Sequence, residues 1–281
     1  MPTFDTPDPI VADLQLGSGR VQLVASDRTD TVVEVHQGSR AGASDRVRVD
    51  LSGRTLTIRS GMLGGLIGGA GAADVTIELP SHSILRVRME NAEVRAKGVL
   101  AECRVDSETG EIELDRTGPL VVHLSRGSVA VGQVAGAVSV RGSRSAVSLG
   151  VVEGAVEVRN GYGDIRIGRA VGDAIVAAGG GEIAIDHMDG NLRVRTAHGA
   201  IRLGEISRGT IDLANAEGDI EIGIPTGTAA WVDARSSHGA VHNDAPPRDA
   251  PPSPTEKTAE VRARTQKGTI RIHPAAQPAS L

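Results

Sequence analysis

A glycine returns every nine or ten residues through the middle of the chain, with a serine once in its place. Each glycine precedes a short alternating segment, such as Asp164 to Ile167, whose second and fourth residues are apolar. This period of two is typical of a strand with one buried face. Strands this short bury their apolar face only by stacking on copies of themselves. The repeat positions are Gly118, Gly127, Gly136, Ser145, Gly154, Gly163, Gly172, Gly181, Gly190, Gly199, Gly209, Gly218 and Gly227.

The pattern predicts an all-β fold, a single-stranded parallel β-solenoid with about two short strands in each coil of roughly 18 residues. Odd and even strands differ, because only one kind is followed five residues after its repeat position by a second glycine. We interpret these second glycines as structural corners that need a positive φ or a close approach of two backbones. They are Gly132, Gly150, Gly168, Gly204 and Gly223.

The spacing also predicts the organisation of the chain as one continuous domain. Residues 1–80 read as an N-terminal cap of β-strands with a glycine-rich loop at 61–72, and residues 81–243 as the solenoid. A proline-rich loop at 244–258, two capping strands at 259–273 and a tail at 274–281 follow. Caps are expected because the ends of a stack expose unpaired strand edges.

The glycine-rich loop carries four large apolar residues: Met62, Leu63, Leu66 and Ile67. One interpretation is a flexible connection, and the other is an exposed contact site for a partner. A phosphate-binding loop is not expected, because no Gly-Lys-Ser/Thr follows and the next segment reads as a strand.

In a solenoid, residues at equivalent places in successive coils form columns, so candidate sites are sought by column. His198, Glu217 and His238 fall in one column and are a metal candidate, with a solvated ladder of imidazoles and carboxylate as the alternative. His238, His242 and Asp244 share one side of a strand and are a second, weaker candidate. Arg141, Arg159 and nearby carboxylates suggest cross-strand ion pairs rather than an anion track.

No catalytic constellation is visible, so the expectation is a protein that is not an enzyme and has no cofactor. Cys103 is the single cysteine and occupies an inward position, which predicts a core thiol rather than a nucleophile. A polysaccharide-active enzyme would need a carboxylate pair that the pattern does not show.

Charge and hydropathy limit the classes of binding partner and the cellular location that we expect. The chain has 281 residues, a net charge of −5 and only one each of Phe, Trp and Tyr, which argues against nucleic acid. No basic start followed by an apolar run and no transmembrane segment are visible, so a cytoplasmic location is the simplest expectation.

The strand from Val75 to Pro80, the Gly-x-Ile/Val repeats and the ending from Asp233 to Asn243 resemble the bacterial β-strand-repeat proteins of unknown function labelled putative adhesins. The resemblance covers nearly the whole chain. It implies a repeat fold and an association with the cell envelope, and it brings no catalytic residue with it.

These observations favour a non-catalytic interaction scaffold that offers a mixed-charge surface to a protein or cell-envelope partner. The alternative is a self-assembling structural rod, a homo-oligomer stacked end to end through Ile270 to Ile272 and the cap. Less favoured is a polysaccharide-active enzyme.

Overall fold

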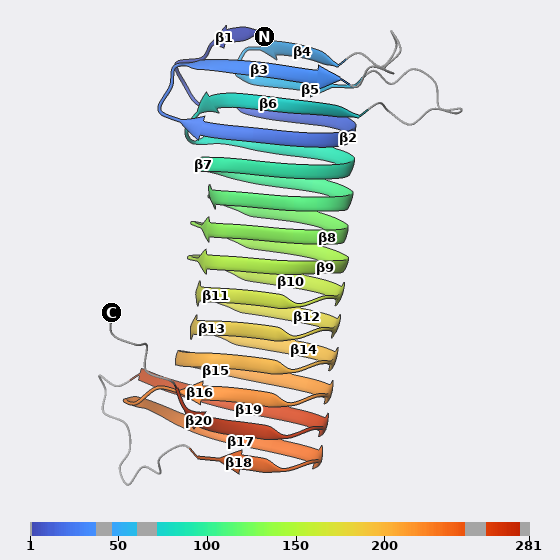
Figure 1. Ribbon diagram of the computed structural model, residues 1–281. Helices are drawn as coiled ribbons and strands as arrows, with labels where there is room; N and C mark the ends of the chain where they lie inside the picture. Colours follow the sequence, from blue (N-terminus) through green and yellow to red (C-terminus); the bar gives the residue numbers. More distant parts are fainter. Residues whose placement is uncertain (1, 38–46, 61–71, 245–256, 276–281) are drawn as a thin grey trace. The chain divides into compact units, whose positions relative to one another are not determined.

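The computed structural model describes residues 2–37, 47–60, 72–244 and 257–275 (Figure 1). These residues contain strands and turns and no helix, which confirms the all-β prediction. The chain divides into two compact units, residues 1–143 and 144–281, and each is described by itself. Within a unit we call the stretch from a residue to its in-register parallel partner a coil.

The first unit contains eight complete strands and the start of a ninth. They are β1 (Thr3–Asp5), β2 (Val11–Ser26), β3 (Asp30–Gln37), β4 (Arg48–Ser52), β5 (Thr55–Arg59), β6 (Ala73–Pro80), β7 (Ser83–Thr117), β8 (Leu120–Val134) and β9 (Val138–Val152). β7 pairs in parallel with β8, with Cys103 opposite Leu120 and Ile112 opposite Val129. Since all four of these side chains are buried, the inward column is continuous from coil to coil.

Parallel coils begin much earlier than the predicted residue 81. β2 pairs in parallel with β7, with Val11 opposite Ile84 and Val21 opposite Val94, so the predicted boundary is wrong. The segment Val11–Ser26 buries alternate residues as the repeats do, but it lacks their regular glycine spacing. Periodic burial therefore defines a coil, and the glycines mark only some of them.

The other edge of β2 is covered by strands that come later in the chain. β5 pairs with its first half and β6 with its second, both in parallel. Antiparallel strands then follow outside these, β4 on β5 and β3 on β6, with β1 on β3. The first long strand of the chain thus lies inside the stack, and the change to antiparallel pairing forms the cap.

The second unit holds β10 (Val156–Tyr162), β11 (Ile165–Val171), β12 (Ala174–Gly180), β13 (Ile183–Asp189), β14 (Leu192–His198), β15 (Ile201–Glu217), β16 (Ile220–Ile224), β17 (Thr228–His238), β18 (Val241–Asn243), β19 (Lys257–Lys267) and β20 (Ile270–Pro274). Val156 pairs with Ala174 and Ala174 with Leu192, a step of 18 residues each time. The inward apolar positions of β10 to β16, β19 and β20 are buried, whereas Val232 of β17 is half-buried and Val241 of β18 is exposed.

The last two strands do not close this unit, contrary to the prediction for residues 259–273. β19 pairs with β15 on one side and β17 on the other, and β20 lies between β16 and β18 in the same way. The predicted assembly surface at Ile270 to Ile272 is wrong for the same reason, since β16 and β18 pair with both edges of β20. Among the described strands of this unit, β17 and β18 are the ones with an unpaired edge.

The five predicted corner glycines lie within strands and none has a positive φ. Close backbone approach is the property that the structure shows for Gly132, Gly168, Gly204 and Gly223. A Cβ at Gly204 would lie 2.7 Å from the carbonyl oxygen of Asp186. Positive φ values belong to the repeat glycines instead, for example 114° at Gly199.

Candidate binding groove

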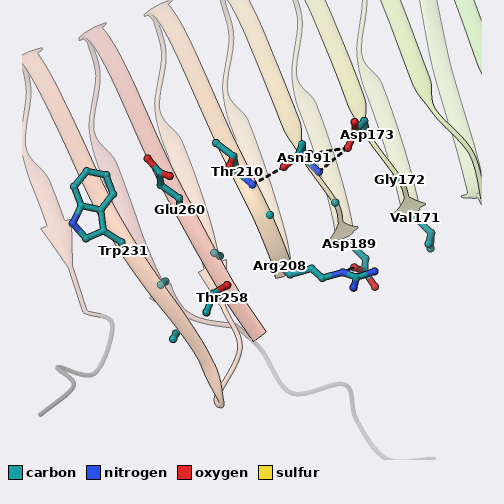
Figure 2. A pocket seen from close by; sticks show the side chains of 15 residues that line it. Val171, Gly172, Asp173, Asp189, Asn191, Arg208, Thr210, Trp231, Thr258 and Glu260 are labelled. Carbon is teal, nitrogen blue, oxygen red and sulfur yellow. Dashed lines mark hydrogen bonds and ion pairs between the residues drawn. The ribbon is translucent and has the colours of Figure 1, made fainter. Parts of the chain in front are cut away.

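An open groove of about 1170 Å³ crosses the coils of the second unit where β11, β13 and β15 pass a glycine (Figure 2). Each of five neighbouring segments contributes three consecutive residues, and the middle one is always glycine or alanine. These middle residues are Gly172, Gly190, Gly209, Ala259 and Ala230. The small side chains leave space between two rows of larger ones.

The first row begins with a hydrogen-bonded ladder of three polar residues. Nδ2 of Asn191 donates to Oδ1 of Asp173 at 2.9 Å, and the backbone N–H of Thr210 donates to Oδ1 of Asn191 at 2.9 Å. The dashed lines in Figure 2 follow this ladder from coil to coil. It fixes the Asn191 amide between the Asp173 carboxylate and the backbone of Thr210.

Glu260 and Trp231 continue the same row. Thr210 pairs in register with Glu260, and Glu260 with Trp231. The indole of Trp231 is 57% exposed, although large aromatic side chains usually bury most of their surface. Oε1 of Glu260 lies 2.6 Å from a guanidinium nitrogen of Arg262, which restrains the carboxylate.

The second row is made by Val171, Asp189, Arg208, Thr258 and Ala229. Nε of Arg208 lies 2.5 Å from Oδ1 of Asp189, so this guanidinium is already paired. Across both rows the lining holds the carboxylates of Asp173, Asp189 and Glu260 against one guanidinium. Since Glu260 is paired with Arg262 and Asp189 with Arg208, Asp173 is the lining carboxylate for which the described residues show no ion pair.

The order of the column His198, Glu217 and His238 that the sequence indicates is wrong in its last step. Glu217 lies beside His198, with 3.3 Å between Oε2 and Nδ1, but its neighbour on the other side is Lys267. His238 pairs in register with Lys267, one coil further out. An ammonium group between Glu217 and His238 disfavours a cation, and the described residues contain no group of three or more metal-ligating side chains.

Lys267 also changes the titration of Glu217. The hydrogen bond from its ammonium group lowers the pKa of the Glu217 carboxyl, with a smaller contribution from His198. This column is a surface ladder of paired charges, which is the alternative that the sequence left open.

Arginines outside the groove are paired with carboxylates, within one strand for Arg159 and across strands, as the sequence favoured, for Arg195. Nη1 of Arg159 lies 2.8 Å from Oε1 of Glu157. An Nη2 of Arg195 lies 2.5 Å from Oδ2 of Asp212. These pairs neutralise the strand faces locally and leave no continuous basic track along them.

Cys103 is fully buried in the first unit, which confirms the prediction of a core thiol. Burial raises the pKa of this thiol to about 12. A thiol with such a pKa supplies almost no thiolate near neutral pH. The predicted contact residues Met62, Leu63, Leu66 and Ile67 lie outside the described residues.

The groove was not predicted from the sequence, although part of its signal is visible there. A polar residue follows the repeat glycine at Asp173, Asn191 and Thr210, which places three hydrogen-bonding groups in one column. Glu260 and Trp231 join this column only because β19 and β17 stack on β15. That stacking order is not encoded in the period of the repeat.

Comparison with known proteins supports the repeat architecture. A family model described as Toastrack DUF4097 matches residues 11–273. No curated protein is significantly similar to the chain. No helix in the described ranges is long and apolar enough to cross a membrane.

Several solved structures share low similarity with the chain over most of its length. A putative adhesin from Parabacteroides merdae is 12% identical, with 96% of this chain and 94% of that one covered and a TM-score of 0.37. A putative adhesin from Bacteroides fragilis is 11% identical, with coverages of 96% and 95% and a TM-score of 0.32. A putative cell adhesion protein from Clostridium sporogenes is 11% identical, covers 97% of each chain and has a TM-score of 0.24.

Proposed function

The chain belongs to the Toastrack family DUF4097, and we propose that it is a non-catalytic interaction scaffold that binds a protein or cell-envelope partner. In this proposal the chain is a single-stranded parallel β-solenoid with about two short strands in each 18-residue coil. The groove beside Trp231 is its contact site. The observation that carries the proposal is this row of five aligned side chains, which ends in an exposed indole.

The rigid backbone under the groove supports a binding role. Each coil segment that lines the groove pairs in register with a neighbour, and the hydrogen bonds from Asn191 to Asp173 and from the backbone of Thr210 to Asn191 restrain two side chains further. A ligand that binds to such a surface orders few side chains, so less free energy is lost on association.

The spacing of the carboxylates supports the absence of catalysis. Asp173 and Glu260 stand three strands apart in one row, which is roughly 14 Å at a strand spacing of about 4.8 Å. Glycosidases hold their two carboxyl groups roughly 5 to 9.5 Å apart. Asp189 is paired with Arg208, so its oxygen is engaged in an ion pair.

The compartment of the partner is a separate part of the proposal. A cytoplasmic location stays a prediction from the sequence. The envelope is the alternative to test first, because the repeats resemble those of proteins labelled putative adhesins.

Co-sedimentation with envelopes from the host bacterium tests the proposal. Folded protein should pellet with them in a saturable manner, and protein with a heat-unfolded β-structure should not. Equal sedimentation of the folded protein and of an unrelated soluble protein would remove the envelope partner from consideration.

A product assay addresses catalysis directly. Neutral and acidic glycans incubated with the protein should give no new reducing ends and no unsaturated products. Release of either product in proportion to protein concentration would contradict the non-catalytic proposal.

Self-assembly is a second candidate function, favoured by the edge of β17 and β18 that has no strand partner among the described residues. Light scattering over a wide range of protein concentration tests it. A mass that rises with concentration supports assembly through this edge, and a constant monomer mass rules it out.

A further inference from the structure

The groove beside Trp231 combines an exposed aromatic face with a line of groups that both donate and accept hydrogen bonds. Among the described residues, the second carboxylate oxygen of Asp173 and the hydroxyl of Thr210 have no hydrogen-bond partner. Asn191 uses one of its two amide hydrogens on Asp173. Unused capacity for hydrogen bonds therefore extends along the row.

The indole adds a different kind of contact. Trp231 is the only tryptophan of the chain, and its ring is 57% exposed at the end of the row. Figure 2 shows the ring beside Glu260 and in line with Thr210. An exposed ring at the end of a polar row suits a ligand with an apolar face and polar edges.

The charge of the groove selects among ligands. Three carboxylates and one guanidinium line it, and the guanidinium is paired with Asp189. An acidic polymer such as a nucleic acid or a uronate chain would meet repulsion from Asp173 and would find the guanidinium groups of Arg208 and Arg262 already paired. A neutral ligand would not meet this repulsion.

Backbone chemistry disfavours an extended peptide. The strand edges at the small middle residues are already paired: the N–H of Gly172 bonds to the carbonyl of Asp189 at 3.0 Å, and that of Gly190 to the carbonyl of Arg208 at 3.3 Å. Peptides that add to a sheet need a free row of such groups, and within the described residues the groove has one only at its last segment, on β17. What the groove offers is side-chain hydroxyl, amide and carboxylate groups.

We infer that this groove binds a neutral oligosaccharide, with one sugar ring on the indole of Trp231 and the next rings along Glu260, Thr210, Asn191 and Asp173. Sugar hydroxyls donate and accept hydrogen bonds, as these side chains require, and the C–H face of a pyranose stacks on an aromatic ring. Successive side chains stand one strand, or about 4.8 Å, apart, which is close to the length of one pyranose. The inference rests on the proposed function, since it names the ligand class of the same groove.

The single tryptophan makes the test direct, because the intrinsic indole emission of the protein comes from the groove alone. The probes are cellohexaose, chitohexaose, laminarihexaose and xylohexaose, each titrated into the full chain up to millimolar concentration. We expect at least one of them to shift the Trp231 emission to shorter wavelength in a saturable manner. The inference would be overturned if none of the four hexasaccharides shifted the Trp231 emission and none gave heat of binding in calorimetry.

Variants measured by calorimetry locate the binding. Trp231→Ala should weaken the Kd about tenfold or more, as expected for loss of an aromatic anchor, whereas Trp231→Phe should retain most of the affinity. Tyr162→Ala is the matched control, because Tyr162 is also an exposed aromatic residue of this unit but does not line the groove. Equal affinity of the Trp231→Ala and Tyr162→Ala proteins would contradict the assignment.

Envelope sedimentation separates this inference from the proposed function. If the hexasaccharides fail to bind while the protein still pellets with envelopes, the ligand class is wrong and the scaffold proposal stands. If both fail, both are wrong. Circular dichroism and the thermal midpoint of each variant confirm that the compared proteins are folded.

Discussion

Nζ of Lys267 lies 3.3 Å from Oε1 of Glu217, although fifty positions separate the two residues in the chain. The contact exists because β19 stacks directly on β15 and separates it from β17. The same insertion puts Glu260 between Thr210 and Trp231. The insertion of β19 between β15 and β17 therefore completes the groove at the end where Glu260 and Trp231 lie.

Engineered cysteines test this stacking order. Residues opposite each other on adjacent strands have Cα atoms about 4.8 Å apart, within the range of roughly 4.4 to 6.8 Å that a disulfide accepts. Glu217→Cys combined with Lys267→Cys should therefore oxidise to an intramolecular disulfide, seen as a loss of two free thiols.

The matched control pairs Glu217→Cys with His238→Cys, which lie two strands apart and should keep both thiols reduced. Buried Cys103 stays in both proteins. If a disulfide formed efficiently between positions 217 and 238 and not between positions 217 and 267, β17 rather than β19 would lie beside β15.

Substitution of a repeat glycine should destabilise the coils. Gly199 has a φ of 114°, and an added Cβ would lie 2.1 Å from the carbonyl oxygen of Gly181. Gly199→Ala should lower the free energy of unfolding by about 2 kcal/mol or more, from backbone strain and from this overlap. Urea unfolding followed by circular dichroism measures the change.

Gly227→Ala separates the two causes of that loss. Gly227 also has a positive φ, of 90°, but nothing lies within 4 Å of an added Cβ. Its cost should be limited to conformational strain, about 1 to 2 kcal/mol. A loss at Gly199 no greater than that at Gly227 would contradict the role of close backbone approach.

Much of the coil structure could be predicted from the sequence, because alternating apolar residues and spaced glycines repeat in register. The order of the end coils could not. Val261, Ala263, Ile270 and Ile272 are apolar at the same alternating positions as in any other coil, so local periodicity is compatible with several stacking orders. Choosing among them depends on contacts between segments that are far apart in the chain.

The candidate site is harder to predict from the sequence, because it too depends on contacts between segments that are far apart in the chain. His198 and Glu217 were placed in one column correctly, since they belong to consecutive coils. The order of the sequence predicts His238 as the next neighbour of Glu217, but Lys267 of β19 lies between them. Trp231 has no repeat partner of its own kind, so only the fold reveals its neighbours.

The Cys103 thiol should make stability depend on pH in alkaline solution. In the unfolded chain a thiol ionises near pH 8.5, whereas burial raises the pKa of Cys103 to about 12 in the folded protein. Between these values only the unfolded state loses the proton, so the free energy of unfolding should fall with rising pH, by about 1.4 kcal/mol per pH unit from this group.

Comparison of the slopes of wild type and Cys103→Ala between pH 8.5 and 10.5 isolates this contribution, since other titrating groups are common to both. The variant should show the shallower decline. Parallel curves, or rapid reaction of the native thiol with a disulfide reagent, would show that Cys103 is not shielded.

Asp212 should contribute stability that is lost in acid. The hydrogen bond from Arg195 lowers the pKa of the Asp212 carboxyl, so the folded state favours its charged form. That contribution is present above the carboxyl's unfolded-state pKa and disappears as the pH falls through the lower folded-state value. Asp212→Asn should lower the free energy of unfolding at pH 7 by less than about 1 kcal/mol, because the pair is partly exposed.

The same pair of proteins compared near pH 2 should differ less, because the wild-type carboxyl is then largely protonated. Urea midpoints at the two pH values give the comparison. A difference that is unchanged or larger in acid would mean that the effect comes from packing and not from the ion pair.

Site-specific photo-cross-linking in the host bacterium tests the central claim most directly, namely that the groove beside Trp231 is where a partner binds. A benzophenone amino acid would replace Trp231 in one protein and Tyr162 in another, and cross-linked products would be separated and identified after irradiation. We predict a discrete product from position 231 and none above background from position 162. Equal products from both positions, or none from position 231 in cells where the protein is abundant, would contradict the account.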